Sequence, residues 1–415
     1  MSEYTLSNGI IVSSAKKVEA GSISIKDGKI ASNAKGAAGG GVSIDLGGAS
    51  IVYPSLINTH DHMQGNYLPR VGPRPGCYYL NWLPWDNDLK ASDTFIERSH
   101  LSREDLYLLS AYKNLFSGAL TVNDHFPRSL NEAILPKLPI RAITNYALAH
   151  EASSYDLKWG DGVEQEHKLA VKNKCPFITH LSEGFDEEAM NGVKNLRKLK
   201  ILDKHCLFVH CIGFSDEDIQ AVAKARASVS WCAASNMLMF NVTCKIRKFL
   251  QAGVNVTIGT DSSASGSINI LAEMRYDRKL YREMYGEDLP AKTLFEMTTA
   301  NAAKAFWMDK ETGALDEGKL GDIMLLKANN SDPFENFAGA EMRDIELLIL
   351  AGKPVYGEMR FIDLLGGELP DGYAQIRVNN RPMFVIGDPA RHYAMCRKKI
   401  GFKKVLDYLP FEPEV

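Results

Sequence analysis

The hydrophobic pattern of this 415-residue chain changes near residue 50. Residues 10–13 and 22–25 have strand character, and the second segment runs into a turn at 26–29 with Asp-Gly at its centre, which is typical of a hairpin. A Gly- and Ala-rich loop at 36–41 precedes another expected strand at 42–46. These strands are too few to close a β-sandwich alone.

From residue 51 onward, apolar segments alternate with helical stretches, among them expected helices at 103–116 and 216–226. Continuous apolar strands separated by helices are typical of buried parallel strands and βαβ units. The pattern predicts seven such strands, one fewer than a full barrel of eight. Either an eighth strand lies within 148–158, or one βα unit is shortened there. The seven strands that the pattern predicts span residues 51–58, 120–123, 142–147, 177–180, 207–211, 228–232 and 254–259.

The chain returns to β-structure after a long helical region at roughly 268–308. We expect the late strands to complete the N-terminal β domain, so that both chain ends contribute to one sheet beside the alternating region. These strands span residues 323–326, 345–350 and 354–356.

The pattern divides the chain into three parts. Residues 1–50 together with 310–362 are expected to form a small β-sandwich domain, and 51–309 a barrel domain. Residues 363–415 form a C-terminal extension with an expected strand at 381–386 and a helix at 389–400, and the sequence assigns it no function.

Composition and charge exclude several classes of protein. Hydrophobic residues make up 45% of the chain and charged residues 24%, so it can bury a large core without disulfides. The net charge is -3 with no basic stripe, which argues against a nucleic-acid partner. Seven scattered cysteines without a C-x-x-C pair predict free thiols in a reducing compartment. With neither a secretory pattern nor an apolar run near the roughly 20 residues of a membrane span, we expect a cytoplasmic protein without a membrane partner.

Candidate chemistry begins with His60-Asp61-His62, directly after an apolar strand. Residues i and i+2 of a strand point to the same face, so two imidazoles project together at the strand's carboxyl end. That end is the catalytic end of a (β/α) barrel, and imidazole is a favoured ligand of zinc and its neighbours. Taken alone, the motif is more often a pair of surface histidines in a loop.

Three further polar residues repeat this placement. His180 ends one expected strand, His210 lies within the next, and Asp261 follows a third. A single strand histidine is more often a core residue. Several such placements in strand order are better explained by one shared site.

These residues, in this order, resemble the amidohydrolase superfamily over about residues 1–360. Within it, the pattern is similar to the metal-dependent deaminase and chlorohydrolase branch that includes guanine deaminase, cytosine deaminase, adenosylhomocysteine deaminases and triazine hydrolases. The resemblance implies an α/β fold with a (β/α)8 TIM-like barrel. One βα unit of this barrel would be shortened if the chain has no eighth strand. The matching segments are HDH, HLSE (180–183), VHC around His210, IGTDS (258–262), Ser235-Asn236, TTANAAKAF (298–306) and GALDEGKLGDIMLL (313–326).

The resemblance also implies a metal site with one divalent ion, Zn²⁺ ahead of Fe²⁺ or Mn²⁺. Asp261, itself one of the implied metal ligands, would also take a proton from water as general base. His210 would hydrogen-bond the water or the developing oxyanion. Glu183 would carry a proton to a ring nitrogen or the leaving group. The implied metal ligands are His60, His62, His180 and Asp261.

The chain departs from the family pattern at two places. Gly184 stands where many relatives carry Thr, and the interval between His125 and His180 is short. No lysine for a carboxylated bridge between two ions stands out, because Lys158 lies in an expected loop. A binuclear site is therefore the lesser interpretation.

Candidate substrate-binding residues follow the strand ends. In the long loop after His62, Gln64 could bond the edge of a heterocycle, and Trp82 or Trp85 could stack on its face. The two tryptophans fit equally a cap on the barrel or a contact with a partner subunit. His150 is a further substrate-binding candidate, and residues 123–125 fit either support of the site or a helix N-cap.

The predicted function is a metal-dependent hydrolase, an aminohydrolase that deaminates a small N-heterocycle of purine, pyrimidine, pterin or triazine type. Two alternatives stay open: amide or carbon–halogen hydrolysis at the same metal, and a catalytically inactive barrel that binds a small molecule. Relatives in the branch imply a homo-oligomer, with a dimer expected.

Overall fold

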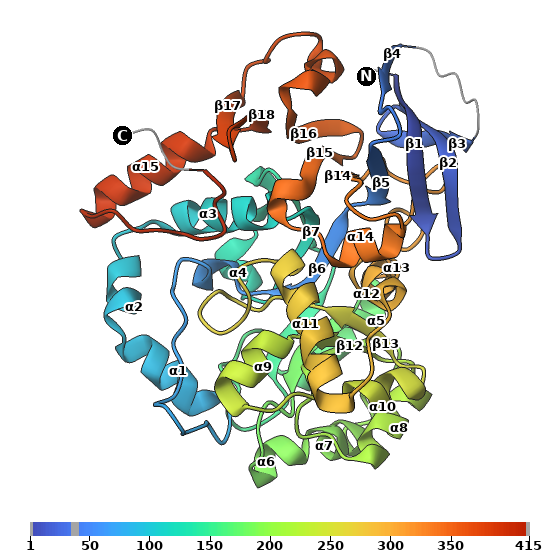
Figure 1. Cartoon of the computed structure of the whole chain (residues 1–415). Helices are drawn as coiled ribbons and strands as arrows, with labels where there is room; N and C mark the ends of the chain where they lie inside the picture. Colours follow the sequence, from blue (N-terminus) through green and yellow to red (C-terminus); the bar gives the residue numbers. More distant parts are fainter. Residues whose placement is uncertain (1–2, 35–40, 412–415) are drawn as a thin grey trace.

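The computed structural model describes residues 3–34 and 41–411. Strands from the two chain ends lie together beside the region of alternating strands and helices (Figure 1). The Gly- and Ala-rich loop expected at 36–41 lies outside the described residues, apart from Gly41.

Strands from both chain ends form one ten-stranded sheet. Its order is β17-β18-β16-β15-β14-β5-β1-β2-β3, and β4 pairs with β1. The antiparallel pair β5 and β14 joins the two ends of the chain. The N-terminal strands are β1 (Tyr4–Ser14), β2 (Lys17–Lys26), β3 (Lys29–Ala34), β4 (Val42–Asp45) and β5 (Ser50–Pro54). The C-terminal strands are β14 (Ile323–Lys327), β15 (Ile345–Leu350), β16 (Lys353–Glu358), β17 (Tyr373–Val378) and β18 (Arg381–Ile386).

The hairpin predicted at residues 26–29 is confirmed. Asp27 and Gly28 join β2 to β3 with φ values of 51° and 79°, and a type I′ turn requires two central residues with positive φ. A side chain at Gly28 would come within 2.8 Å of the Ala351 carbonyl oxygen, because the turn between β15 and β16 packs against this hairpin. The turn of an N-terminal hairpin thus packs directly against that of a C-terminal hairpin.

Eight parallel strands form the alternating region, in two ladders. The amide of Asp261, beyond the last strand, donates to the His60 carbonyl at 3.1 Å, and the Thr59 hydroxyl donates to the Ile258 carbonyl at 2.9 Å. The first and last strands therefore lie side by side. One ladder holds β6 (Leu56–Asp61), β7 (Ala119–Asp124) and β8 (Arg141–Ala142). The other holds β9 (Ala147–Glu151), β10 (Phe177–Leu181), β11 (Cys206–His210), β12 (Ser228–Trp231) and β13 (Asn255–Ile258).

Two predictions of single strands are wrong. The run 51–58 breaks at Ser55, so that β5 belongs to the ten-stranded sheet and β6 to the parallel strands. The run 142–147 breaks into β8 and β9, and β9 supplies the strand that the pattern sought in 148–158. Hydrophobicity could not mark the first break, because the residues on both sides of it are buried, whereas the second break falls at the exposed residues Thr144 and Asn145.

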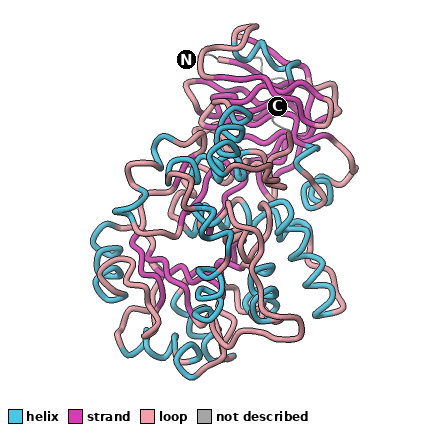
Figure 2. The backbone as a smooth tube through the Cα atoms, turned by 90° about the vertical axis from the view of Figure 1, so that its left-hand side faces the viewer, coloured by secondary structure: helices cyan, strands magenta, loops and turns pink. Residues whose placement is uncertain are grey.

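The helices surround the parallel strands, which form the lower of the two groups of strands in Figure 2. The predicted helices at 103–116 and 216–226 are confirmed as α3 and α8, and each begins with a capping box, at Ser102 and at Ser215. The region predicted to be helical at 268–308 forms three helices. Gly286, in a left-handed conformation, ends the first of them. The α-helices are α1 (Trp82–Ala91), α2 (Asp93–Arg98), α3 (Arg103–Leu115), α4 (Arg128–Asn131), α5 (Val163–Asn173), α6 (Glu187–Met190), α7 (Gly192–Lys198), α8 (Asp216–Ala225), α9 (Ala233–Phe240), α10 (Ile246–Gln251), α11 (Ile270–Tyr285), α12 (Ala291–Thr298), α13 (Ala300–Ala305), α14 (Pro333–Ala338) and α15 (Pro389–Ile400). The short 3-10 helices are η1 (Met63–Gly65), η2 (Leu135–Lys137), η3 (Met342–Asp344) and η4 (Met359–Leu365).

The C-terminal extension continues the ten-stranded sheet and then crosses α3. The strand predicted at 381–386 and the helix predicted at 389–400 are confirmed as β18 and α15. His392 of α15 places its Nε2 3.1 Å from the Asp105 carbonyl of α3, and the Phe411 ring lies 5.6 Å from that of Phe116. In the described ranges, none of the helices has the length and apolar character needed to cross a bilayer.

Candidate metal centre and its cavity

Six histidines meet at the carboxyl edge of the parallel strands. Neighbouring imidazole rings in this cluster lie between 4.2 and 5.7 Å apart. They come from β6, β9, β10 and β11 and from the residues that directly follow β6 and β7. Because the carboxyl ends of parallel strands meet at one edge, residues far apart in the sequence converge here. The six are His60, His62, His125, His150, His180 and His210.

His60 and His180 face each other through their Nε2 atoms, which are 3.4 Å apart. The Nδ1 of His180 donates to the His150 carbonyl at 2.8 Å, which leaves its Nε2 with a free lone pair. Burial, reinforced by the neighbouring imidazoles, holds the pKa of both residues well below the usual value. Both rings are therefore neutral and suited to bind a cation.

Asp261 brings a carboxylate to the same space. Its Oδ1 lies 3.7 Å from the Nε2 of His62 and 4.0 Å from that of His60. The hydroxyls of Ser235 and Ser265 donate to Oδ2 at 2.7 and 3.0 Å. Burial raises the pKa of Asp261, but the nearby imidazoles and hydrogen bonds outweigh burial, and the pKa lies below its ordinary value.

Glu183 and His210 form a second pair beside these donors, with Oε1 and Nε2 3.5 Å apart. His210 has a φ of 70° and directs Nδ1 to the Asn236 side-chain oxygen at 2.8 Å. Burial raises the pKa of Glu183 well above its usual range, and the charges of Asp261 and Glu151 add to this effect. Burial also lowers the pKa of His210, so the proton of the pair resides on Glu183.

Asp61, between the two histidines of the motif, points away from this space. Its carboxylate accepts hydrogen bonds from Asn66, Asn114 and the ammonium of Lys113, the last at 3.3 Å. The Lys113 ammonium also lies 3.4 Å from the Asp261 carbonyl. Helix α3 therefore ties the end of β6 to the end of β13, a role that the helical pattern of the sequence did not reveal.

Three of the donors, His62, His180 and Asp261, line a cavity of about 320 Å³ together with Glu183 and His210. All four residues predicted to bind substrate, Gln64, Trp82, Trp85 and His150, line it as well. The indole nitrogens donate outward, from Trp82 to the Glu151 carboxylate at 2.6 Å and from Trp85 to a backbone carbonyl at 2.9 Å. Fixed at this edge, both indoles form part of the cavity wall.

His150 lies between two tryptophans in the wall. Its ring centre is 4.6 Å from those of both Trp82 and Trp159. Burial, with a contribution from His62, lowers the pKa of His150 to about 3, so this ring is neutral. His125 stacks on His180 at 4.2 Å and supports it from behind, while Pro127 occupies the N-cap of α4.

Sequence reasoning missed Trp159 and Phe126, which also line the cavity. The signal for Trp159 was an aromatic residue next to a glycine in a loop that follows a strand. Lys158, considered for a bridge between two ions, is not among the residues that line the cavity.

Packing explains the departure at Gly184. A Cβ atom there would lie 2.7 Å from the Cβ of Asn81 and 2.8 Å from the Leu80 carbonyl oxygen. The Phe185 amide donates to the same carbonyl at 2.8 Å. The residue after Glu183 is therefore pressed against the loop that carries Trp82, where a threonine would not fit.

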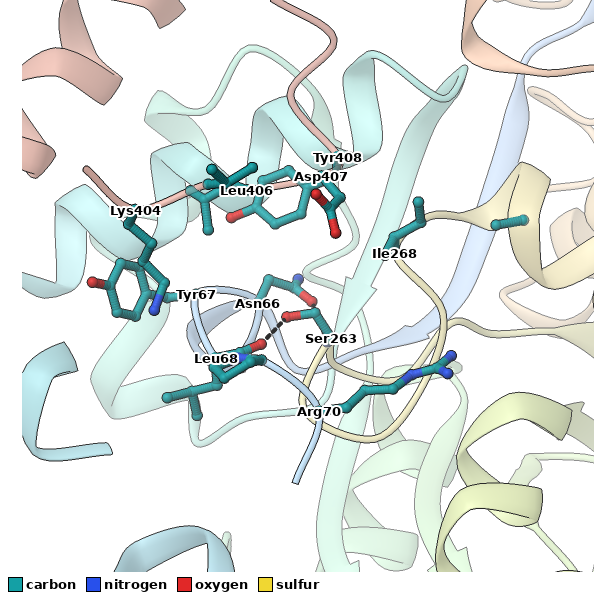
Figure 3. Close-up of a pocket in the computed structure, with 13 residues that line it drawn as sticks. Asn66, Tyr67, Leu68, Arg70, Ser263, Ile268, Lys404, Leu406, Asp407 and Tyr408 are labelled. Carbon is teal, nitrogen blue, oxygen red and sulfur yellow. Dashed lines mark hydrogen bonds between the residues drawn. The ribbon is translucent and has the colours of Figure 1, made fainter. Parts of the chain in front are cut away.

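A second cavity, of about 400 Å³, lies behind the loop that follows His62. Figure 3 shows Leu406, Asp407 and Tyr408 of the C-terminal segment opposite Asn66 and Ser263. Asn66 bonds the Asp61 carboxylate at 2.7 Å and accepts from the Ser263 amide at 2.9 Å. The C-terminal segment thus packs behind the loops that support the candidate metal centre.

Comparison with known proteins links this geometry to one family. The model of the amidohydrolase family matches residues 170–355. A 5-methylthioadenosine/S-adenosylhomocysteine deaminase of Thermoanaerobacter pseudethanolicus is 24% identical over 361 residues, 74% of this chain and 82% of that protein.

Solved structures share the fold. An adenosine deaminase from Xanthomonas campestris with bound zinc has a TM-score of 0.74 at 17% identity, covering 95% of this chain and 97% of that one. The atrazine chlorohydrolase of Arthrobacter aurescens complexed with zinc has a TM-score of 0.74 at 18% identity, covering 96% and 100%. The architecture is accordingly a TIM-like barrel with a second domain.

Proposed function

This chain belongs to the amidohydrolase family, and from that premise we propose that it is a metal-dependent aminohydrolase. It removes an amino group from a small N-heterocycle of purine, pyrimidine, pterin or triazine type by hydrolysis of a carbon–nitrogen bond. One observation carries the proposal: three imidazoles and a carboxylate surround a common space beside the Glu183–His210 pair, in a single cavity.

The donor set fits one divalent ion held by His60, His62, His180 and Asp261. The 3.4 Å between the Nε2 atoms of His60 and His180 is close to the roughly 3.3 Å between two nitrogens that bind one zinc at about 2.0 Å. When bound, the ion, Zn²⁺ in preference to Fe²⁺ or Mn²⁺, would lower the pKa of a water toward neutrality.

Asp261 is suited to act as general base toward that water. Its pKa lies below the ordinary value, so it is ionised at neutral pH. Ser235 and Ser265 orient the carboxylate through Oδ2, and Oδ1 faces His62. A carboxylate fixed in this way would lose little entropy on taking up a proton.

Glu183 is suited to supply the opposite step, donation of a proton to the ring nitrogen or to the departing amino group. Its raised pKa keeps the carboxyl protonated at neutral pH. His210, with Nδ1–H bound to Asn236, presents Nε2 to the Glu183 proton and holds the acid in place.

The walls of the cavity favour a flat substrate. Trp82, Trp85, Trp159 and Phe126 offer aromatic faces, and Gln64 offers an amide to a ring edge. His150 is neutral and can accept or donate a hydrogen bond to the ring.

Elemental analysis of metal per chain, paired with an ammonia-release screen over aminated purines, pyrimidines, pterins and triazines, tests the proposal. About one zinc or iron per chain with ammonia from one ring class supports it. One metal without ammonia favours amide or carbon–halogen hydrolysis at the same site. No metal in protein prepared without chelators contradicts it and leaves a barrel that binds a small molecule.

The finer architecture belongs to the same proposal. We propose that the eight parallel strands close into a (β/α)8 barrel and that the ten-stranded sheet folds over its core as a sandwich. Residues 1–50 and 310–362 then form the second domain, which the strands at 373–386 extend.

The seven cysteines, all unpaired, support a cytoplasmic protein, and the family supports a homodimer.

A further inference from the structure

One cation in the wall of the catalytic cavity has no anion beside it. Apart from the candidate catalytic residues, the charged residues that line the cavity are Asp86, Lys90 and Arg98. Lys90 binds Asp86 at 2.5 Å, one turn earlier on α1, so these two charges compensate each other. The side chain of Arg98, the last residue of α2, has no hydrogen bond or ion pair within residues 3–34 and 41–411.

The acidic neighbour of Arg98 is bound elsewhere. Glu97 accepts a hydrogen bond from the Tyr67 hydroxyl and pairs with the Lys404 ammonium at 3.0 Å. Burial lowers the pKa of Arg98, and no carboxylate opposes this effect, which agrees with the absence of a partner.

The guanidinium of Arg98 is held with its donor edge free. It lies over the Phe95 ring, 4.2 Å from the ring centre, and Phe95 lines the same cavity. A guanidinium stacked on an aromatic face keeps its N–H fork in the plane, available to a carboxylate or phosphate.

A half-buried cation without a counter-ion is costly unless a ligand supplies one. In the proposed function, a flat substrate ring lies against the aromatic walls and turns its reacting edge to the histidine cluster. Arg98 then faces a substituent at another position of the same substrate. We propose that Arg98 is a specificity residue that binds an acidic substituent, a carboxylate or phosphate, on the heterocycle that this site deaminates. The inference rests on the proposed function.

Matched pairs of compounds test the inference with zinc-loaded protein. Each pair shares one aminated ring: pterin with pterin-6-carboxylate, cytosine with 5-carboxycytosine, and adenosine with adenosine 5′-monophosphate. For the ring class that releases ammonia, kcat/KM of the acidic member should exceed that of the neutral member by about 10-fold or more. The first two pairs report on a carboxylate and the third on a phosphate.

Variants then assign the preference to Arg98. Arg98→Gln should lower kcat/KM for the acidic member by about 10- to 100-fold, mainly through KM, and leave the neutral member and the metal content unchanged. Arg98→Lys should keep part of the preference, because it retains the charge. Arg197→Gln, exposed on α7 and outside the cavity, is the matched control. A wild type that prefers the neutral members, or an Arg98→Gln variant equally impaired on both, overturns the inference.

Binding separates this inference from the proposed function. If no compound of the full ammonia-release screen is deaminated, the deaminase proposal fails, and equilibrium dialysis of the same six compounds decides the role of Arg98. If wild type binds the acidic members and Arg98→Gln does not, the result supports Arg98 as an anion-binding residue. If wild type shows no preference for the acidic members, the result overturns the inference.

Discussion

Glu183 keeps its proton because three features act on one carboxyl group. It is buried, it lies near the charges of Asp261 and Glu151, and it faces an unprotonated nitrogen of His210 at 3.5 Å. Each feature disfavours the carboxylate relative to the acid. A single side chain is thereby prepared for proton donation at neutral pH.

Replacement of Glu183 by Gln should abolish turnover and spare the metal. The amide keeps the shape of the carboxyl group but cannot donate the proton, so kcat should fall by at least about 100-fold. Ammonia release and elemental analysis measure the two effects. Glu187→Gln, exposed on α6, should behave as wild type. A Glu183→Gln variant with normal turnover would show that another group carries the proton.

At the scale of elements, α3 supports the candidate metal centre from behind. Lys113 lies fully inside the protein and bonds groups at the ends of both β6 and β13, among them the Asp61 carboxylate. Asn66 accepts from the same ammonium at 2.7 Å. The helix thus fixes the spacing between the strand that carries His60 and the loop that carries Asp261.

Lys113→Met should therefore loosen this junction. The variant leaves the Asp61 carboxylate buried without its cation, which costs about 3–5 kcal/mol in comparable buried pairs. We expect a lower unfolding midpoint in urea and faster loss of zinc to a chelator. Lys168→Met, with an exposed lysine on α5, controls for the loss of charge. Unchanged stability and unchanged zinc retention in Lys113→Met would contradict this role.

Helix α11 carries two buried carboxyl groups. Glu273 and Asp277 are both fully buried, and neither oxygen of Asp277 has a hydrogen-bond partner in the described part of the chain. Burial raises the pKa of Asp277 well above its ordinary value, and that of Glu273 to about 7. Between the unfolded pKa near 4 and about 7, the folded state holds more protons than the unfolded state, so stability falls as pH rises through this window.

Asp277→Asn should relieve part of this loss. The amide has no charge to bury, so the melting temperature should rise by roughly 2–6 °C at pH 8 and by less at pH 5. Thermal unfolding of metal-loaded protein at the two pH values measures the difference. Glu283→Gln, exposed on the same helix, should show no such pH dependence. A variant that is less stable than wild type at both pH values would contradict this account.

At the scale of the whole molecule, ligands of the candidate metal come from strands distributed along the chain. Binding of an ion by His60, His62, His180 and Asp261 would join β6, β10 and the segment after β13, and so would stabilise only the folded state. Removal of the ion by a chelator should lower the unfolding free energy by about 4 kcal/mol at free ion near 1,000 times Kd.

Thermal unfolding with and without a chelator measures this coupling. Wild type should melt several degrees lower in the chelator, and His60→Ala should melt at the same temperature in both conditions, because it no longer holds the ion. Equal melting temperatures of wild type in both conditions would show that no ion contributes to its stability.

The sequence by itself determined the features that depend on local pattern. The hairpin at Asp27-Gly28, the capping boxes of α3 and α8, and the helix α15 follow from turn chemistry, helix caps and periodicity over a few residues. The strand-end placement of His60, His180, Glu183, His210 and Asp261 was also readable, and the structure brings these residues into one site.

Only the tertiary structure decided what depends on packing between distant segments. The break at Ser55 has no hydrophobic signature, because buried strands continue on both sides. The lysine at 113 reads as one polar position of a helix, and Arg98 as a surface charge, until the structure shows what surrounds each. Local free energies favour elements through near neighbours in the chain, whereas a site's shape and charge balance arise from contacts that the chain makes only once folded.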